Sequence, residues 1–312
     1  MSNNKIEFPY KLFDRLILDF LSMKNCKILF VVITLCLAGC SKNPGGLPII
    51  LHPLPLNFFV ADTSAKRGSA FSTNSTNGTW SSNIFSLRSN WFYTWGTTIP
   101  SQTGIGNIEF VPMFWGSGNV NPDNIAAVKQ MKSNGTAHYI LGFNEPDMPD
   151  QANMTVQAAL TLWPQLESIG LPLGSPATSW PTRQWMYDFM DAAIAQHRRV
   201  DFICVHMYVG LDEASFIQVL QDLYSKYHLP IWITEFATAD FSATTTSNNR
   251  YTPAQVLAFM QRVLPKLEAL PYVKRYSWFS GSVTWADLWS SALIDASGQL
   301  TANGTWYSTY KP

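Results

Sequence analysis

Charged residues are scarce in this chain of 312 residues. They make up 13% of it, and 21 basic residues balance 21 acidic ones. No run or stripe of Lys and Arg occurs, which argues against a nucleic-acid partner. No GxxxxGK segment is present, and the glycines at 104 and 106 lack a third glycine and a following helical pattern. The sequence therefore offers no sign of a nucleotide site.

Cysteine is also rare, and its placement indicates a leader. Lys24 and Lys27 precede an apolar run that is shorter than the about 20 residues of a membrane span. Leu37-Ala38-Gly39-Cys40 follows at once, and these four residues resemble a bacterial lipobox. We expect residues 1–39 to be a signal peptide, with Met23 as an alternative start, and Cys40 to be lipidated. A plain secretory signal with a chance cysteine is the alternative.

The rest of the chain is expected to form one catalytic body after a tether. Residues 40–55 are rich in Pro, Gly and Asn, which is typical of a flexible link, and 56–312 form the body. Cys204 would be the one thiol left, so an internal disulfide is excluded. This organisation predicts a monomeric bacterial envelope lipoprotein, anchored in the outer membrane through Cys40, or a secreted protein.

Short apolar runs alternate with helical patterns in the body, which favours βα units and a parallel sheet. Asn121-Pro122, Asp212 and Thr252-Pro253 mark helix starts. Eight strands with intervening helices predict an α/β fold, a single-domain (β/α)8 TIM barrel, with an open doubly wound sheet as the alternative. The expected strands are 69–71, 91–95, 110–114, 139–143, 171–174, 202–205, 231–234 and 276–279.

Two of these apolar runs end on a glutamate, Glu145 after strand four and Glu235 after strand seven. Glutamate usually lies in water unless it is paired. In a (β/α)8 barrel both carboxyls would open onto one bowl at the C-terminal strand ends. Paired carboxyls predict a glycoside hydrolase, and a separation of about 5–5.5 Å would make one a nucleophile and retain configuration. The alternative is a strand-end salt bridge, but neither segment contains Arg or Lys.

An ordered set of motifs resembles glycoside hydrolase family 128, a family of clan A. The motifs are KRG at 66–68, WFYTW at 91–95, FVPMFWG at 110–116, GFNEPD at 142–147, HMY at 206–208 and WITEFA at 232–237. The resemblance implies a compact (β/α)8 barrel and endo-acting, retaining hydrolysis of β-1,3-glucan. It makes Glu145 the acid/base and Glu235 the nucleophile. This chemistry needs no cofactor and no metal.

Polar residues near the two glutamates are further candidates for binding the sugar. Asn144 could bond the sugar 2-hydroxyl. His206 and Tyr208 follow strand six and could orient Glu235 or bond a sugar hydroxyl. A structural role is the alternative for His206.

Aromatic residues at the strand ends could form sugar platforms. Trp278 is placed at the end of strand eight, where clan members commonly have such a platform, and Phe279 takes that place if the register differs by one. Trp115 and Trp95 are candidates for further subsites, and core packing is the alternative for each ring. Trp180, Trp285 and Trp289 lie on expected loops and could line the cleft, and the polar loop at 238–250 could reshape it.

The expected partner is a β-glucan polysaccharide or oligosaccharide. The alternatives are a glycosidase for another β-linked glycan and a non-catalytic surface lipoprotein that binds glucan. The presence of both carboxylates argues against the second of these.

Overall fold

The computed structural model describes residues 64–73, 79–100 and 105–312, all of which belong to one compact unit. The expected signal peptide, tether and lipidation site at Cys40 lie outside these residues and stay predictions. Within the described ranges, no helix is both long enough and apolar enough to cross a bilayer.

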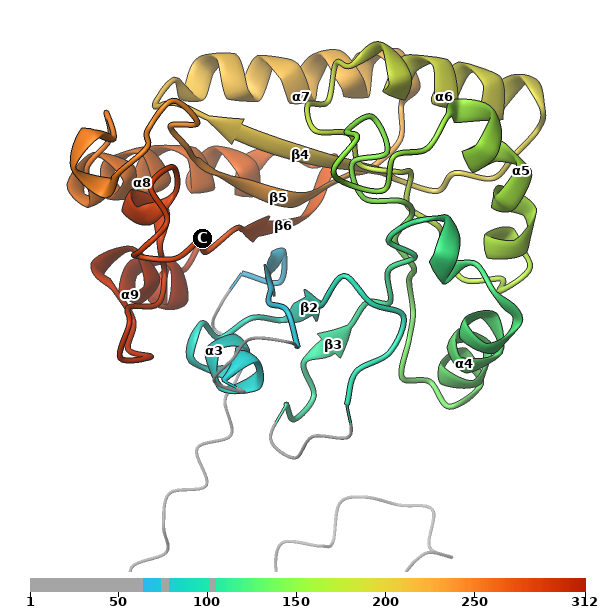
Figure 1. Ribbon diagram of the computed structural model, residues 1–312, viewed down its shortest axis with the longest axis horizontal. Helices are drawn as coiled ribbons and strands as arrows, with labels where there is room; N and C mark the ends of the chain where they lie inside the picture. Colours follow the sequence, from blue (N-terminus) through green and yellow to red (C-terminus); the bar gives the residue numbers. More distant parts are fainter. Residues whose placement is uncertain (1–63, 74–78, 101–104) are drawn as a thin grey trace, which may run out of the picture. The chain divides into compact units, whose positions relative to one another are not determined.

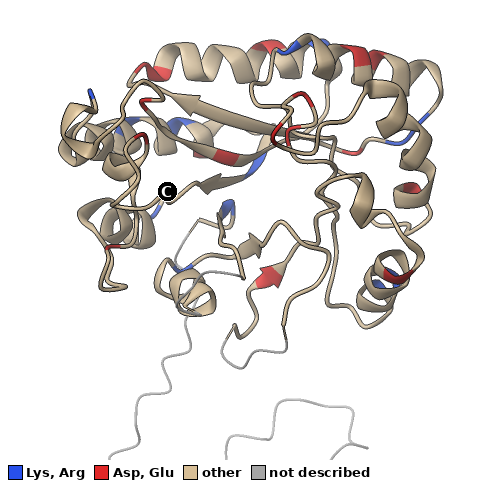
Figure 2. Cartoon of the chain, in the orientation of Figure 1, with Lys and Arg blue, Asp and Glu red and all other residues tan. Residues whose placement is uncertain are grey.

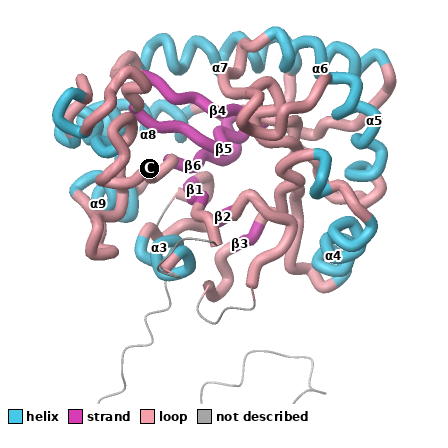
Figure 3. Tube along the Cα trace, in the orientation of Figure 1, coloured by secondary structure: helices cyan, strands magenta, loops and turns pink. Residues whose placement is uncertain are grey.

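A parallel sheet forms the centre of the described body (Figure 3). Six strands pair in the order β3-β2-β1-β6-β5-β4. Their bounds are β1 Arg67–Ala70, β2 Trp91–Tyr93, β3 Glu109–Phe110, β4 Ile203–Val209, β5 Ile231–Thr238 and β6 Val273–Trp278. Parallel bridges continue the ladder, pairing Met113 with Leu141, Ile140 with Leu173 and Gly174 with Phe202. Because Phe202 leads directly into β4, the ladder closes, and the predicted (β/α)8 barrel is confirmed.

Helices surround this barrel (Figure 1). The α-helices are α3 Trp80–Ser86, α4 Pro122–Ser133, α5 Val156–Glu167, α6 Gln184–Ala195, α7 Glu213–Tyr227, α8 Pro253–Ala269 and α9 Ala302–Thr309. Short 3-10 turns are η2 Ser117–Asn119, η3 Thr246–Asn248 and η4 Trp289–Ser291. The described residues between β2 and β3 contain no helix, so this connection departs from the regular βα repeat.

The helix starts follow from capping side chains. Asn121 accepts a hydrogen bond from the Asn124 amide, and Asp212 caps α7 in the same way. Thr252 and Gln255 form a reciprocal capping box at the start of α8. Each cap satisfies amide groups that the first helical turn leaves without partners, which confirms these three predicted starts.

The strands bury both of their faces. In β4, Ile203, Val205 and Met207 join the apolar cluster between barrel and helices, whereas Cys204 joins the cluster inside the barrel. Figure 2 shows that the charged residues lie mainly on the outer helices and the connecting loops. Strands buried on both sides leave little room for charge, which explains the low charged content of the chain.

A bulge interrupts the alternation of β5. Ile233 pairs with Tyr276 and Phe236 pairs with Trp278, so β5 carries one extra residue here. Ile233 and Phe236 both pack in the outer cluster although they are three residues apart. A bulge makes this possible, because it changes the face to which later side chains point. Glu235 consequently lies on the same inner side as Trp232.

Two strands run further than the apolar pattern predicts. The sequence places their ends at 205 and 234, but β4 continues to Val209 and β5 to Thr238. Glu235 therefore lies inside a strand, paired with His206 of β4, rather than at a strand end. Both side chains are buried. Polar and apolar side chains share this stretch: Met207 and Phe236 stay buried in the outer cluster, and the Tyr208 hydroxyl donates to Glu235.

Candidate active site

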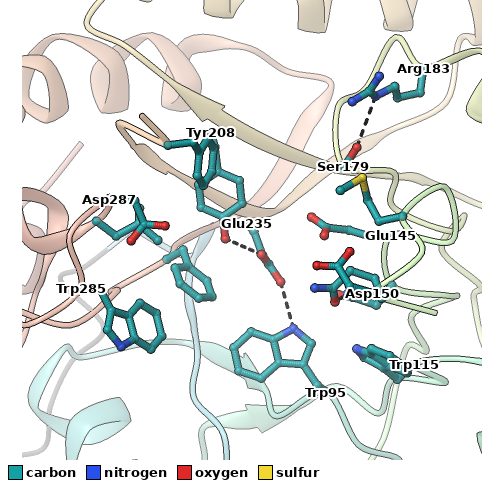
Figure 4. Close-up of a pocket in the computed structure, with 16 residues that line it drawn as sticks. Trp95, Trp115, Glu145, Asp150, Ser179, Arg183, Tyr208, Glu235, Trp285 and Asp287 are labelled. Atoms are coloured by element: carbon teal, nitrogen blue, oxygen red, sulfur yellow. Dashed lines mark hydrogen bonds between the residues drawn. The ribbon is translucent and has the colours of Figure 1, made fainter. Parts of the chain in front are cut away.

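A cleft of about 760 Å³ lies at the C-terminal side of the barrel strands and contains both Glu145 and Glu235 (Figure 4). Its walls come mainly from the loops that follow the strands. The residues from the sequence prediction that line it with them are Asn144, Tyr208, Phe279, Trp115, Trp95 and Trp285. His206 and Trp278 are buried and do not line it, and Trp180 and Trp289 do not line it either.

The two glutamates approach each other closely. One carboxylate oxygen of Glu145, one of Glu235 and a ring nitrogen of His206 all lie within 4.8 Å of one another. Barrel closure produces this meeting, because Glu145 follows the strand at 139–143 and Glu235 lies in β5, and both strands run toward the same end of the barrel.

Glu235 is held by three donors. Its Oε1 accepts from the Tyr93 hydroxyl at 3.0 Å and from Nε1 of Trp95 at 2.9 Å, and its Oε2 accepts from the Tyr208 hydroxyl at 2.6 Å. Donors of this kind stabilise an ionised carboxylate. Burial, and then the charge of Glu235, raise the pKa of Tyr93 and of Tyr208 well above the ordinary value. Both phenols therefore remain protonated donors at neutral pH.

Glu145 stands on a strained backbone. Its φ of 41° lies in the left-handed region, which costs a non-glycine residue about 1–3 kcal/mol. The amide of Glu145 donates to the carbonyl of Ala177 at 2.7 Å and so holds the turn against the next strand. Three residues earlier, a Cβ on Gly142 would lie 2.9 Å from the carbonyl oxygen of Gly174. Only glycine allows this close strand contact, and it sets the position of the glutamate.

His206 lies between the two carboxylates. Its Nδ1 shares a hydrogen bond of 2.8 Å with Oε1 of Glu145, and its Nε2 is 3.6 Å from Oε1 of Glu235. Burial alone lowers the pKa of His206, but the charge of Glu235 and the hydrogen bond to Glu145 outweigh it and raise that pKa. The ring is 0% exposed. It contacts the carboxylates rather than the cleft, which favours the orienting role over a bond to sugar.

The residues beside Glu145 are fixed by neighbouring loops. The Asn144 amide donates to Oε1 of Gln151 at 3.2 Å, and its buried Oδ1 has no partner among the described residues. The Asp147 carboxylate accepts from the amide and the hydroxyl of Ser179, at 2.9 and 2.6 Å. These bonds join the loop after residues 139–143 to the loop after residues 171–174, the fourth and fifth strands of the barrel.

Glu145, His206 and Glu235 are also the one set of His, Cys, Asp and Glu side chains in the described part that lies close enough to hold a metal ion. The donor set fits a metal poorly. Both oxygens of Glu235 already accept hydrogen bonds from O–H or N–H groups, and Nδ1 of His206 shares a hydrogen bond with Glu145. These atoms would have to give up those hydrogen bonds to coordinate a metal.

Comparisons with known proteins place this cleft in a family. Residues 68–307 match the glycosyl hydrolase catalytic core family. A mutant of a subgroup I family 128 endo-β-1,3-glucanase from Amycolatopsis mediterranei, solved with laminaripentaose, is 33% identical with a TM-score of 0.68, over 79% of this chain and 99% of that one. The chain belongs to glycoside hydrolase family 128.

Two further relatives agree with this membership. A subgroup II family 128 endo-β-1,3-glucanase from Pseudomonas viridiflava is 29% identical with a TM-score of 0.63, over 79% of this chain and 98% of that one. "Alkali-sensitive linkage protein 1" of Schizosaccharomyces pombe is 30% identical over 258 residues, which are 79% of this chain. The chain spans 45% of the length of that relative. The resemblance inferred from the motifs is thus confirmed, and the chain is a glycoside hydrolase.

The structure contradicts the expectation that Trp278 of this glycoside hydrolase is a sugar platform. Trp278 is 1% exposed, its Nε1 donates to the carbonyl of Ser291 at 2.9 Å, and its ring packs against Phe236. In β6, Tyr276 and Trp278 alternate onto the outer face, so the next residue faces the cleft. Phe279 therefore lines the cleft, as the alternative register predicts.

This correction has a measurable consequence for stability. Trp278→Ala should lower the free energy of unfolding by about 3–5 kcal/mol, because it removes a fully buried ring. Urea denaturation measures this effect. Phe279→Ala is the matched control and should destabilise much less while raising KM. A Trp278→Ala variant of native stability with a raised KM would restore the original prediction.

Sequence reasoning missed several residues at the site. For Tyr93 a signal existed, because it lies two residues before Trp95, and strand alternation places both side chains on the same face of β2. The others lie on loops, where no period predicts which side chain turns inward, even for the loop at 238–250 that is expected to reshape the cleft. They are Met148, Asp150, Gln151, Ser179, Arg183, Phe241, Asp287 and Leu288.

Proposed function

We propose that this glycoside hydrolase cleaves β-1,3-glucan internally with retention of configuration, using Glu235 as nucleophile and Glu145 as acid/base. The separation of the two carboxylates carries the proposal. Retaining enzymes hold their carboxyl groups about 5–5.5 Å apart, and inverting enzymes about 6.5–9.5 Å. Oxygens of Glu145 and Glu235 within 4.8 Å of each other leave no room for an attacking water between carboxyl and sugar.

In the first step, an oxygen of Glu235 attacks the anomeric carbon while Glu145 gives its proton to the leaving glycosidic oxygen. The three donors on Glu235 hold its carboxylate in place for the attack. A glycosyl ester to Glu235 forms, and the leaving half of the glucan departs with the proton. Asn144 lines the cleft beside Glu145, and we assign it the hydrogen bond to the sugar 2-hydroxyl, a contact that strengthens in the transition state.

In the second step, Glu145 removes a proton from water, and this water attacks the same anomeric carbon. The ester bond to Glu235 breaks, so the sugar leaves with its original configuration. Glu145 is protonated again, and Glu235 is again a carboxylate. His206 keeps the two carboxylates in register through both steps, because it contacts both of them.

Similar structures support the choice of substrate. The Amycolatopsis and Pseudomonas proteins are endo-β-1,3-glucanases, and the first is bound to laminaripentaose. A cleft of about 760 Å³ that is open to solvent suits a polymer that enters from the side.

Proton NMR during hydrolysis of laminarin tests the proposal. We expect new reducing ends to appear first as the β-anomer and to equilibrate later to the α-anomer. The early products should be a range of oligosaccharides, since an internal attack leaves chains of many lengths.

Each part of the proposal fails on its own result. Early α-anomer would exclude retention, and glucose as the sole early product would exclude internal attack. Hydrolysis of another β-linked glycan in place of laminarin would overturn the assignment of β-1,3-glucan as the substrate. Laminarin binding without hydrolysis would leave a glucan-binding protein.

A further inference from the structure

Exposed aromatic rings gather at one side of the cleft. Among the described residues, the exposed large apolar side chains are Phe85, Ile194, Phe241 at 67% and Trp285 at 49%. Two of these four, Phe241 and Trp285, line the cleft. Exposed apolar surface inside a cleft is typical of a ligand-binding wall.

These two rings belong to a continuous row. Phe241 lies edge-on to Tyr208 with ring centroids 5.8 Å apart, and Tyr208 lies edge-on to Phe279 at 5.6 Å. Phe279 is nearly parallel to Trp285, with a centroid distance of 6.3 Å and an interplanar angle of 28°. The hydroxyl of Tyr208 bonds Glu235, so the row starts at the proposed nucleophile.

Most side chains on the opposite side of the cleft are polar. Figure 4 shows Tyr208, Trp285 and Asp287 on one side of Glu235, which we call the aromatic half. Glu145 lies on the other side with Asp150, Ser179 and Arg183, which we call the polar half, although the ring of Trp115 also lies there.

The proposed reaction assigns a direction to these halves. Glu145 protonates the leaving oxygen, so the leaving part of the glucan extends over the polar half. Glu235 bonds the sugar that stays, so the units on the non-reducing side of the cut extend over the aromatic half. This step rests on the proposed function.

Two loops are clamped together to make the aromatic half. Asp240, next to Phe241, donates its amide to the carbonyl of Asp287 at 2.9 Å. The Asn249 side chain donates to the carbonyls of Ala286 and Asp287, at 2.8 and 3.1 Å. The loop after β5 and the loop after β6 thus present their side chains as one surface.

The Asp240 carboxylate closes the loop after β5 on itself. It is 0% exposed and accepts from the amide and the guanidinium of Arg250, both at 2.9 Å. Phe241 is therefore held out at the rim although its own ring is exposed.

We propose that Phe241, Trp285 and Asp287 form a binding wall for the neutral glucosyl units on the non-reducing side of the cleaved bond. The two rings stack on the C–H faces of the sugars. The Asp287 carboxylate, which has no ion pair in the described part, accepts hydrogen bonds from sugar hydroxyls. A carboxylate on this wall also disfavours sulfated or uronic sugars. Asn249 is a positioning residue that acts through Asp287.

Aryl glycosides with one leaving group and a growing glycone test this wall. We expect kcat/KM of the wild type to rise from p-nitrophenyl β-laminaribioside to the trioside and tetraoside. Trp285→Ala and Phe241→Ala should each lower kcat/KM on the tetraoside by about tenfold or more, equal to about 1.4 kcal/mol, with much less loss on the bioside. Asp287→Asn should act in the same direction.

The controls separate a binding role from a structural one. Phe85→Ala removes a ring that is 55% exposed on α3 and does not line the cleft, and this variant should leave kcat/KM unchanged on all three substrates. Asn249→Ala should reproduce the length-dependent loss of kcat/KM. If Asn249 had a merely structural role, its replacement would lower kcat/KM equally on all three substrates. Equal loss on all three substrates, or no loss on any, in the Trp285 and Phe241 variants overturns the wall.

Failure of the wall can be told from failure of the proposed function. If the wild type does not hydrolyse any aryl laminarioside, the proposed function fails. Calorimetric titration of Glu235→Gln with laminaripentaose then still tests the wall. Weaker binding in the double variants with Trp285→Ala or Phe241→Ala supports it, and unchanged binding overturns it.

Discussion

Replacing Glu235 by alanine is expected to lower kcat on laminarin by about four orders of magnitude or more. The covalent intermediate cannot form without this carboxylate, and water has no base on that side of the sugar. The hydrogen-bond donors of Tyr93, Trp95 and Tyr208 would remain around the space that the carboxylate leaves. A reducing-sugar assay measures the loss.

The same donors make a specific rescue experiment possible. Azide can occupy the space left by Glu235→Ala, where the donors would stabilise its charge. Azide should restore turnover of an aryl β-laminaribioside and give the α-glycosyl azide, because one inversion replaces two. Glu213→Ala, which removes a glutamate that pairs with Arg262 at 3.2 Å on the surface, is the matched control and should keep wild-type turnover. Turnover of Glu235→Ala near the wild-type rate would refute the nucleophile.

Replacing Glu145 by alanine is expected to lower kcat/KM on laminarin by about 10²–10⁴-fold. A sugar alkoxide is a poor leaving group and needs the proton. Dinitrophenolate leaves without one, so kcat/KM on 2,4-dinitrophenyl β-laminaribioside should change little. Comparing the two substrates measures the contribution of the acid.

The second step distinguishes Glu145 from a residue that only shapes the cleft. Without the base, the glycosyl ester should accumulate on the dinitrophenyl substrate and give a burst of dinitrophenolate. Added azide should raise the steady-state rate and give the β-glycosyl azide, since it attacks the ester without a base. Equal losses on both substrates, with no burst, would contradict the acid/base role.

The periodic parts of the chain were predictable. Apolar runs and caps such as Asn121 and Thr252 depend on neighbours within four residues, and the structure confirms these starts and the barrel. The strand ends were less predictable. Residues 206–209 and 235–238 mix polar with apolar side chains, and they stay in strands because the parallel ladder between β4 and β5 continues through them.

The orientation of individual side chains was the hardest part to predict. Trp278 and Phe279 are neighbours, and only the strand register decides which ring enters the cleft. The bulge in β5 turns Glu235 inward, and nothing in the motif around it signals an extra residue. Phe241 and Trp285 come together through backbone bonds between two loops, which have no period at all.

The amino-acid order by itself determined that this chain alternates strands and helices, and that two of its few glutamates follow apolar runs. Those properties come from local propensity and from burial, which act over a few residues. Only the closed barrel decided that Glu145 and Glu235 meet around His206, which donors hold each of them, and which aromatic rings face the sugar. These contacts join residues from different strands and loops, and their geometry depends on register, bulges and closure that no short segment contains.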